Sequence, residues 1–488
     1  MTVKLTARWV LGFDGADHVL FEDGEVVFDD SGVRHAGHRT DCPADTHQAL
    51  GHALIAPGFI DLNALADVDT TILGFGGKSP PGAKTWGARY AASAHDVLTL
   101  DEIVTGARGA FCQLLLSGVT TALPVTSILF RRWAESGDEF DAMADLAQEL
   151  GIRLFLGPSF RSFVNVEEDD GIVGQRVDEA AGLAGLADAV AFIERSRGSR
   201  GGLVSGLLVP STIETCSDEL LLRTAAAAEA LDVSFRLHCC QSRTEANLMW
   251  RRSGKSSLAH LGDLGILSDR ALLPHAIHLG GPDADPALVR ADRLALRESG
   301  AVVVHCPLVI GRGGRRLESF AAFRDEGIRI GIGTDTAPPN MLMNLQLGLA
   351  MARAGDSAST APADYLRAAT LGGADALRRS DLGRLATGSS ADIVAWDLSS
   401  LEVQPVHNPL EALFLMPPGR ARHVWVAGRQ VVRDGRVVGV NELEMAAAMQ
   451  EIFEVLRASF SERHRHGHAW PDLFPPPFQV VPKAAANN

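Results

Sequence analysis

Eight short strand-like runs alternate with helical patterns through the middle of this chain, and that alternation restricts the fold more than any other feature. The runs are rich in apolar residues: those that follow Pro57, then 118–124, 152–156, 203–209, 233–238, 271–275, 301–305 and 328–333. Helical patterns separate them at 100–117, 142–150, 183–197, 219–231, 286–299 and 317–326. Eight strands with intervening helices predict an α/β protein with a (β/α)8 barrel, whose functional residues follow the C-terminal ends of the strands.

The two ends of the chain carry short strand patterns that are too few to form a core separately. They lie at 4–11, 25–29 and 32–37 near the N-terminus, and at 391–397, 423–428 and around the hairpin signal Asp434-Gly435 near the other end. We therefore expect a small composite β-sandwich domain built from residues 1–54 and 388–440. The barrel, residues 55–387, would be inserted in it. Residues 441–488 predict a C-terminal helix and a Pro-rich tail.

Composition limits the kind of partner. A net charge of −15 disfavours binding to nucleic acid or to an anionic membrane, and no apolar stretch approaches the length of a membrane span. Six scattered cysteines without a metal-finger spacing indicate a reduced, cytoplasmic protein. We expect a small-molecule substrate and assembly into a homodimer or a higher homo-oligomer.

Polar side chains follow the later strands of the predicted barrel. The fifth, sixth and seventh strands end in His238, His275 and His305, and the eighth is followed by Gly333-Thr-Asp335. A single histidine at a strand end is usually structural, but three in succession with an aspartate favour a functional site. Converging imidazoles and a carboxylate suit zinc or iron binding, or proton transfer. Arg161, after the third strand, is a candidate for substrate binding.

Together these segments resemble the amidohydrolase superfamily, and within it the deaminase and chlorohydrolase-like branch of triazine hydrolases and guanine deaminases. The resemblance covers nearly the whole length. It rests on Ala56-Pro-Gly-Phe-Ile-Asp61, Gly118-Val-Thr-Thr121, His238, His275-Ala-Ile-His-Leu279, His305-Cys-Pro307, Gly333-Thr-Asp335 and 383–392. It implies hydrolysis of carbon–nitrogen bonds other than peptide bonds and one divalent metal, zinc or iron.

The metal-binding motifs depart from the pattern of that family. Two histidines usually follow the first strand, where this chain has Asn63 and Leu65. The usual general acid/base, a glutamate three residues after the fifth-strand histidine, is replaced by Gln241, which exchanges no proton at neutral pH. Of the mononuclear metal site of the family, only His238 and Asp335 are kept.

Three hypotheses follow from these departures. In the first, an active enzyme holds a shifted metal, as sugar-phosphate deacetylases of the same superfamily do, with an additional carboxylate from Glu214, Asp67 or Asp69. In the second, no metal is bound, and His275, Asp335 and Cys239 perform acid/base or nucleophilic chemistry. In the third, the barrel is catalytically degenerate and acts as a ligand-binding or scaffold protein.

We adopt the first hypothesis, in which the protein deaminates a small heterocycle or opens its cyclic amide. The expected metal ligands are His238, His275 and Asp335, with the ion weakly bound or absent. The expected catalytic positions are Asp335, His275 and Gln241, and the expected substrate-binding residues are Asn63, Arg161 and His305. A Gly/Pro-rich segment, 74–87, is expected to cover the barrel mouth as a lid.

Overall fold

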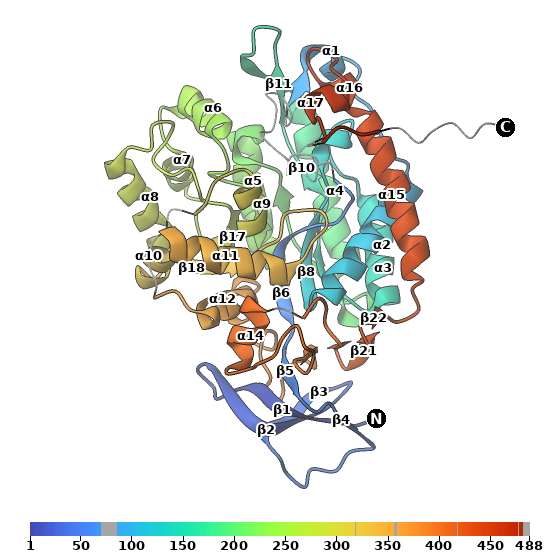
Figure 1. The fold of residues 1–488 in the computed structure, drawn as a ribbon. Coiled ribbons are helices and arrows are strands. Elements are labelled where there is room, and N and C mark those ends of the chain that lie inside the picture. Colours follow the sequence, from blue (N-terminus) through green and yellow to red (C-terminus); the bar gives the residue numbers. More distant parts are fainter. Residues whose placement is uncertain (70–84, 318, 356–358, 417, 477, 482–488) are drawn as a thin grey trace, which may run out of the picture.

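A computed structural model describes the chain except for residues 70–84, 318, 356–358, 417, 477 and 482–488. A β-sheet at one end carries a barrel surrounded by helices (Figure 1). The polypeptide enters the barrel from the sheet through β5 (Ala53–Pro57), so the C-terminal ends of the barrel strands lie at the end of the molecule away from the sheet.

In the described part of the chain, strands from both ends form one sheet of nine strands. Strand β5 runs antiparallel to β19 (Ile393–Asp397), which gives the expected pairing of the two chain ends. The other members are β1 (Val3–Phe13), β2 (His18–Asp29), β3 (Gly32–His38), β4 (Thr46–Ala49), β20 (His423–Val426), β21 (Arg429–Arg433) and β22 (Arg436–Val437). Apolar side chains from both ends, among them Leu5, Phe28, Ile393 and Trp425, share one core cluster.

The predicted (β/α)8 barrel is confirmed. Its parallel strands are β6 (Phe59–Leu65), β8 (Val119–Val125), β9 (Arg153–Leu156), β13 (Val204–Gly206), β15 (Phe235–Arg236), β16 (Ala271–Pro274), β17 (Val302–His305) and β18 (Arg329–Ile332). The backbone N–H of Arg236 donates to Leu208 O over 2.9 Å, which joins the two halves of the barrel. The backbone N–H of Asp335 donates to Asn63 O over 2.8 Å, which closes the barrel between the last strand and the first.

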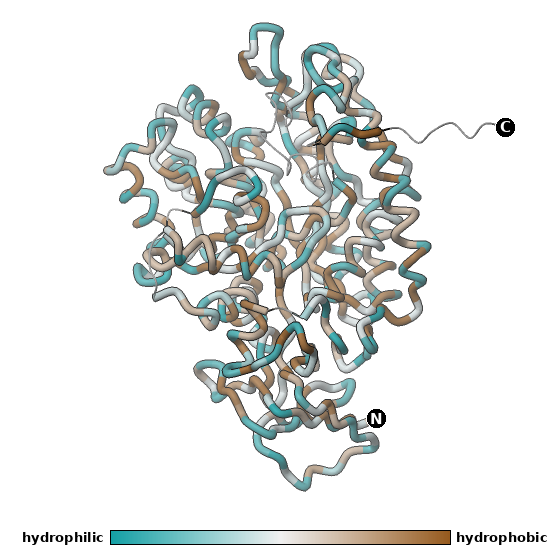
Figure 2. Tube along the Cα trace, viewed as in Figure 1, coloured by the Kyte–Doolittle hydropathy of each residue, from teal (hydrophilic) through white to brown (hydrophobic). Residues whose placement is uncertain are grey.

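Helices cover the barrel on the outside (Figure 1). They are α2 (Leu100–Leu116), α3 (Gly137–Leu150), α4 (Glu179–Ser196), α5 (Asp218–Leu231), α8 (Pro286–Ser299) and α10 (Phe320–Asp325), followed by α11 (Met341–Gly355), α12 (Pro362–Ala369), α13 (Leu371–Ala376) and α14 (Pro409–Leu415). Hydrophilic and hydrophobic residues alternate along the outer helices (Figure 2), as expected where one face of a helix packs inward. Helix α8 has the predicted bounds because Asp285 caps its N-terminus and Gly300, with φ 71°, ends it.

Short elements surround the barrel mouth. They include α6 (Arg243–Ser253), α7 (Ser257–Asp263), α9 (Pro307–Arg312) and a hairpin of β11 (Phe163–Glu167) and β12 (Val173–Val177), which pairs with β7 (Trp86–Gly87). The C-terminal helix α15 (Glu442–Ala458) is present, and Arg465 beyond it pairs with Glu167 at 2.8 Å. The expected lid lies largely outside the described residues, as does the end of the Pro-rich tail. Among the described helices, none has the length and apolar character needed to cross a membrane.

Candidate functional site

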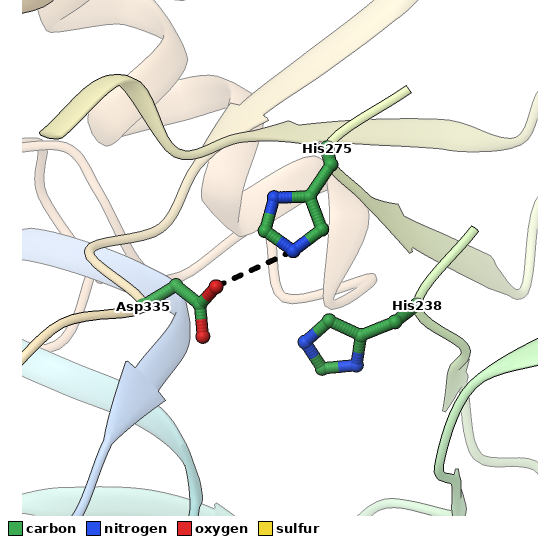
Figure 3. Close-up of side chains that lie close together, drawn as sticks. All are labelled: His238, His275 and Asp335. Atoms are coloured by element: carbon green, nitrogen blue, oxygen red, sulfur yellow. Dashed lines mark ion pairs between the residues drawn. The ribbon is translucent and has the colours of Figure 1, made fainter. Parts of the chain in front are cut away.

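Three of the residues expected at the site meet at the mouth of the barrel (Figure 3). His238 follows β15, His275 follows β16 and Asp335 follows β18. Each offers a donor atom, and these atoms lie within 4.8 Å of one another. His275 Nε2 lies 3.3 Å from Asp335 Oδ2, and the two imidazole rings are 5.3 Å apart between centroids. The strand order therefore brings together two imidazoles and a carboxylate that are distant in the sequence.

The backbone that carries this cluster has unusual dihedral angles. His275 has a φ of 83° and Asp335 a φ of 45°, both in the left-handed region, and Cys240 beside His238 has a φ of 56°. Such conformations cost a non-glycine residue about 1–3 kcal/mol and concentrate at functional sites. Hydrogen bonds from the neighbouring strands maintain them, since the His275 N–H donates to Val304 O over 2.9 Å.

Asn63 takes part in the cluster through a hydrogen bond. Its Nδ2 lies 3.3 Å from His238 Nε2, and His238 Nδ1 lies 3.1 Å from the carbonyl oxygen of Ser211. This pattern fits an imidazole that donates from Nδ1 to Ser211 O and accepts at Nε2 from the Asn63 amide. The Asn63 Oδ1 atom is buried and has no hydrogen-bond partner. This oxygen can therefore accept a hydrogen bond from a substrate or a water molecule, or contact a cation.

Leu65 contributes no donor. It is buried in a small apolar cluster with Val125 and Ala337, as a hydrocarbon side chain requires. The strand-one half of the family metal site is thus filled with an amide and an aliphatic side chain.

The donor set at the remaining half fits a divalent metal. Two imidazole nitrogens and one carboxylate oxygen are ligands that zinc and non-haem iron accept, and catalytic zinc sites commonly use three protein ligands. The additional carboxylate expected from Glu214, Asp67 or Asp69 is not found in this cluster among the described residues. Glu214 instead accepts from Asn165 Nδ2 over 3.1 Å, and Asp67 accepts from the Ser127 N–H over 2.5 Å.

Asp61 organises the floor of the site from within the barrel. Its carboxylate accepts from the N–H and the hydroxyl of Thr334, over 3.0 and 2.6 Å, and from the N–H of Asn63 over 3.1 Å. Burial raises the pKa of this carboxyl to about 6 although the hydrogen bonds oppose the shift. Asp61 therefore fixes both Asn63 and the turn that carries Asp335.

Gln241 is held by its backbone outside the three-residue cluster. Its N–H donates to Glu245 Oε2 over 2.6 Å, and its carbonyl oxygen accepts from Arg315 over 2.9 Å. Glu245 also accepts from the Cys240 N–H over 2.6 Å, and burial raises the pKa of this carboxyl to about 8. Glu245 thus shapes the loop after β15, a role that the sequence alone did not indicate.

Cys239, an alternative nucleophile in the second hypothesis, is unsuited to that role. Its side chain is buried in the core cluster of the helical layer. The hydrogen bond to Cys240, whose Sγ lies 3.7 Å away, and burial raise the pKa of the Cys239 thiol well above its ordinary value. The thiol therefore stays protonated at neutral pH, and the thiolate is the nucleophilic form.

The expectation that His305 contacts the substrate is wrong. Val304 and Cys306 belong to the cluster inside the barrel, so His305 between them points outward, as alternation along a strand requires. Its ring packs against Phe320 and Tyr365 with centroids 5.9 and 6.1 Å away. Burial lowers the pKa of His305 to about 3, so the imidazole is neutral.

Arg161 lies apart from the cluster, beyond the end of the third strand. It is 4% exposed, and its guanidinium lies between Trp86 and Trp133, 5.3 and 5.6 Å from the ring centroids. Burial lowers the pKa of this side chain to about 9, and its Nε and Nη2 atoms have no hydrogen-bond partner. Those N–H groups remain able to donate to a ligand.

The imidazoles and the carboxylate lie at the C-terminal face of a closed (β/α)8 barrel, where barrel enzymes carry their active sites. Residues 54–431 match the Amidohydrolase family, and the chain belongs to that family. The predicted family and the predicted class, a hydrolase of carbon–nitrogen bonds other than peptide bonds, are confirmed.

Similar proteins include deaminases. The chain is 29% identical over 442 residues to a 5-methylthioadenosine/S-adenosylhomocysteine deaminase of Desulforudis audaxviator, a match that covers 89% of this chain and 93% of that protein. It is 29% identical over 439 residues to an 8-oxoguanine deaminase of Pseudomonas aeruginosa, with 88% and 92% covered.

Solved structures share the fold. An adenosine deaminase of Xanthomonas campestris with bound zinc superposes with a TM-score of 0.76 at 22% identity, over 93% of this chain and 98% of that one. The atrazine chlorohydrolase of Arthrobacter aurescens complexed with zinc gives a TM-score of 0.74 at 21% identity, over 92% and 100%.

Proposed function

We propose that this protein is a deaminase of amino-substituted heterocycles of the purine class, with a metal site reduced to His238, His275 and Asp335. The observation that carries the proposal is the convergence of these three side chains, two of them on backbone in the left-handed region. Full-length similarity to purine deaminases supports the substrate class.

His238, His275 and Asp335 would hold the ion. A divalent metal in such a site acts as a Lewis acid and makes water acidic enough to react near neutral pH. The Asp335 carboxylate would accept the proton of the attacking water and return it to the departing amine, because the Gln241 amide is neither an acid nor a base near neutral pH. His275 Nε2 and Asp335 Oδ2 lie 3.3 Å apart, so both groups face the place where the ion would be held.

Two further residues bind the substrate in this proposal. Asn63 has a buried Oδ1 that suits an N–H group of a heterocycle. The free N–H groups of Arg161 suit an acceptor at the periphery of the substrate, and Trp86 and Trp133 limit the movement of the guanidinium. Exclusion of water by this burial strengthens each of these hydrogen bonds.

Ammonia release from a panel of aminopurines and their nucleosides tests the proposal, with protein supplied with zinc or ferrous iron. Asp335→Asn should lower kcat/KM by at least about 100-fold, because it removes the general base while keeping the shape of the side chain. The matched control is Asp364→Asn, on α12 outside the barrel, which should stay within about threefold of wild type.

A non-catalytic binding protein is the competing function, and the apolar packing of Leu65 favours it. Thermal stabilisation by an aminopurine without ammonia release from any member of the panel would establish that alternative and contradict the deaminase proposal.

A further inference from the structure

A buried arginine lies in the barrel interior. Arg236, in β15, is 0% exposed. Its guanidinium donates to the backbone carbonyl oxygens of Leu123 over 2.5 Å and Pro124 over 3.0 Å, and lies 3.5 Å from that of Leu62. All three contacts are with backbone carbonyl oxygens. Burial lowers the pKa of Arg236 to about 10, and the charges of Glu135, Asp335 and Asp61 oppose that shift. A buried charge without a direct ion pair is costly, so its presence calls for an explanation.

Arg236 lies directly below the candidate site. It precedes His238 by two positions, so both side chains point into the barrel, about 7 Å apart along the strand. One carbonyl that it contacts belongs to Leu62, and the next residue, Asn63, contacts His238 through its amide. The positive charge is therefore separated from the cluster by a single layer of residues.

We propose that Arg236 is a fixed positive charge at the floor of the candidate site that weakens the binding of a divalent cation to His238, His275 and Asp335. Carbonyl dipoles hold the guanidinium in place but do not neutralise it. It repels a doubly charged ion bound above it. The inference rests on the proposed function in one respect, which is that the three-residue cluster binds a cation.

Metal affinity measures this effect without any assay of activity. For a guanidinium and a divalent ion between about 7 and 12 Å apart and an effective dielectric constant of about 20, Coulomb's law gives an effect on the dissociation constant well above tenfold. Allowing for relaxation around the substituted side chain, removal of the charge should tighten Co²⁺ binding by at least roughly tenfold.

Co²⁺ is titrated into metal-stripped protein in competition with a chromophoric chelator. Arg236→Met removes the charge with little change in volume, Arg236→Gln keeps a donor for the carbonyl oxygens, and Arg236→Lys keeps the charge. Both neutral variants should bind Co²⁺ at least about tenfold more tightly than wild type, whereas the lysine variant should match wild type. Arg329→Met is the matched control, because Arg329, at the start of β18 and at the opposite end of the barrel, also donates to backbone carbonyl oxygens, those of Gly300 and Asp375, over 2.8 and 2.9 Å.

Circular dichroism shows which variants fold. Equal Co²⁺ affinity in wild type and a folded neutral variant, or tighter binding by Arg236→Lys, would overturn the inference. Absence of Co²⁺ binding in every folded variant would overturn it as well. The deaminase proposal is tested separately, by ammonia release.

Discussion

Replacing His305 with phenylalanine would show whether His305 has a structural or a catalytic role. The ring of His305 packs outside the barrel wall, against Phe320 and Tyr365, and its contact with the Tyr365 hydroxyl is 3.4 Å long. His305→Phe keeps an aromatic ring in that place and removes the group that titrates. At pH 8 the free energy of unfolding should stay within about 1.5 kcal/mol of wild type, the usual cost of a near-isosteric core change.

The pH dependence of stability gives the sharper result. Burial lowers the pKa of His305 to about 3, whereas an exposed histidine in the unfolded chain titrates near 6.5. Between these values the unfolded state binds more protons, so the free energy of unfolding decreases as the pH falls from 6.5 toward 3. The contribution amounts to roughly 2 kcal/mol at pH 5. His305→Phe should therefore lose about 2 kcal/mol less than wild type between pH 8 and pH 5.

Urea denaturation at pH 8, 6.5 and 5, followed by tryptophan fluorescence, measures this difference. Ammonia release by the same variant should keep kcat/KM within about threefold of wild type. His275→Phe is the matched substitution at the neighbouring strand end, and it should abolish activity because His275 faces the inside of the barrel. Identical pH profiles of wild type and His305→Phe, or an equal loss of activity in the two variants, would refute the assignment.

Two further predictions concern the junction with the sheet and the strand-one positions. Arg153→Leu should destabilise the protein by about 3–5 kcal/mol in urea denaturation, because Asp392, paired with Arg153 at 3.1 Å, is left as a buried charge. A double variant that also replaces Asp392 with leucine should recover most of that loss. Asn63→His combined with Leu65→His adds two nitrogen donors and should raise the metal retained against a chelator at least about tenfold. No increase in retained metal would mean that the cavity is remodelled beyond metal binding.

The order of the strands and helices could be predicted because each carries its own periodicity and end signals. Helix α8 illustrates this, since Pro286 can begin a helix and Gly300 can end one without strain. The β11–β12 hairpin also carries an end signal, Asp170-Gly171 between its strands, but its position against β7 carries none. Its residues, 163–167 and 173–177, are only partly buried and pair with β7, about 80 residues earlier in the chain. No local pattern reports a partner at that distance.

The site could be predicted only to the level of strand ends. A histidine at a strand end lies at the mouth of the barrel, but whether it faces inward depends on alternation along the strand. His305 follows the alternation and faces outward. Alternation from Leu272, inside the barrel, would place His275 outward too, but its left-handed backbone, with a φ of 83°, accompanies a side chain that faces Asp335. The same rule applied to His238 indicates that Arg236 also points inward. The sequence alone does not indicate this buried position, because an arginine in a strand is ordinarily a surface residue.

The two sides of the candidate site are held by different interactions. On the side of β15, β16 and β18, three donor atoms face one another on partly strained backbone, an arrangement that a ligand can stabilise. On the side of β6, hydrogen bonds within the protein hold the site. The Asp61 carboxylate accepts from Thr334, and Asn63 O accepts from the Asp335 N–H. These bonds join the first strand to the last without an ion. A metal bound by His238, His275 and Asp335 would therefore serve the chemistry of the site, and the closure of the barrel would not depend on it.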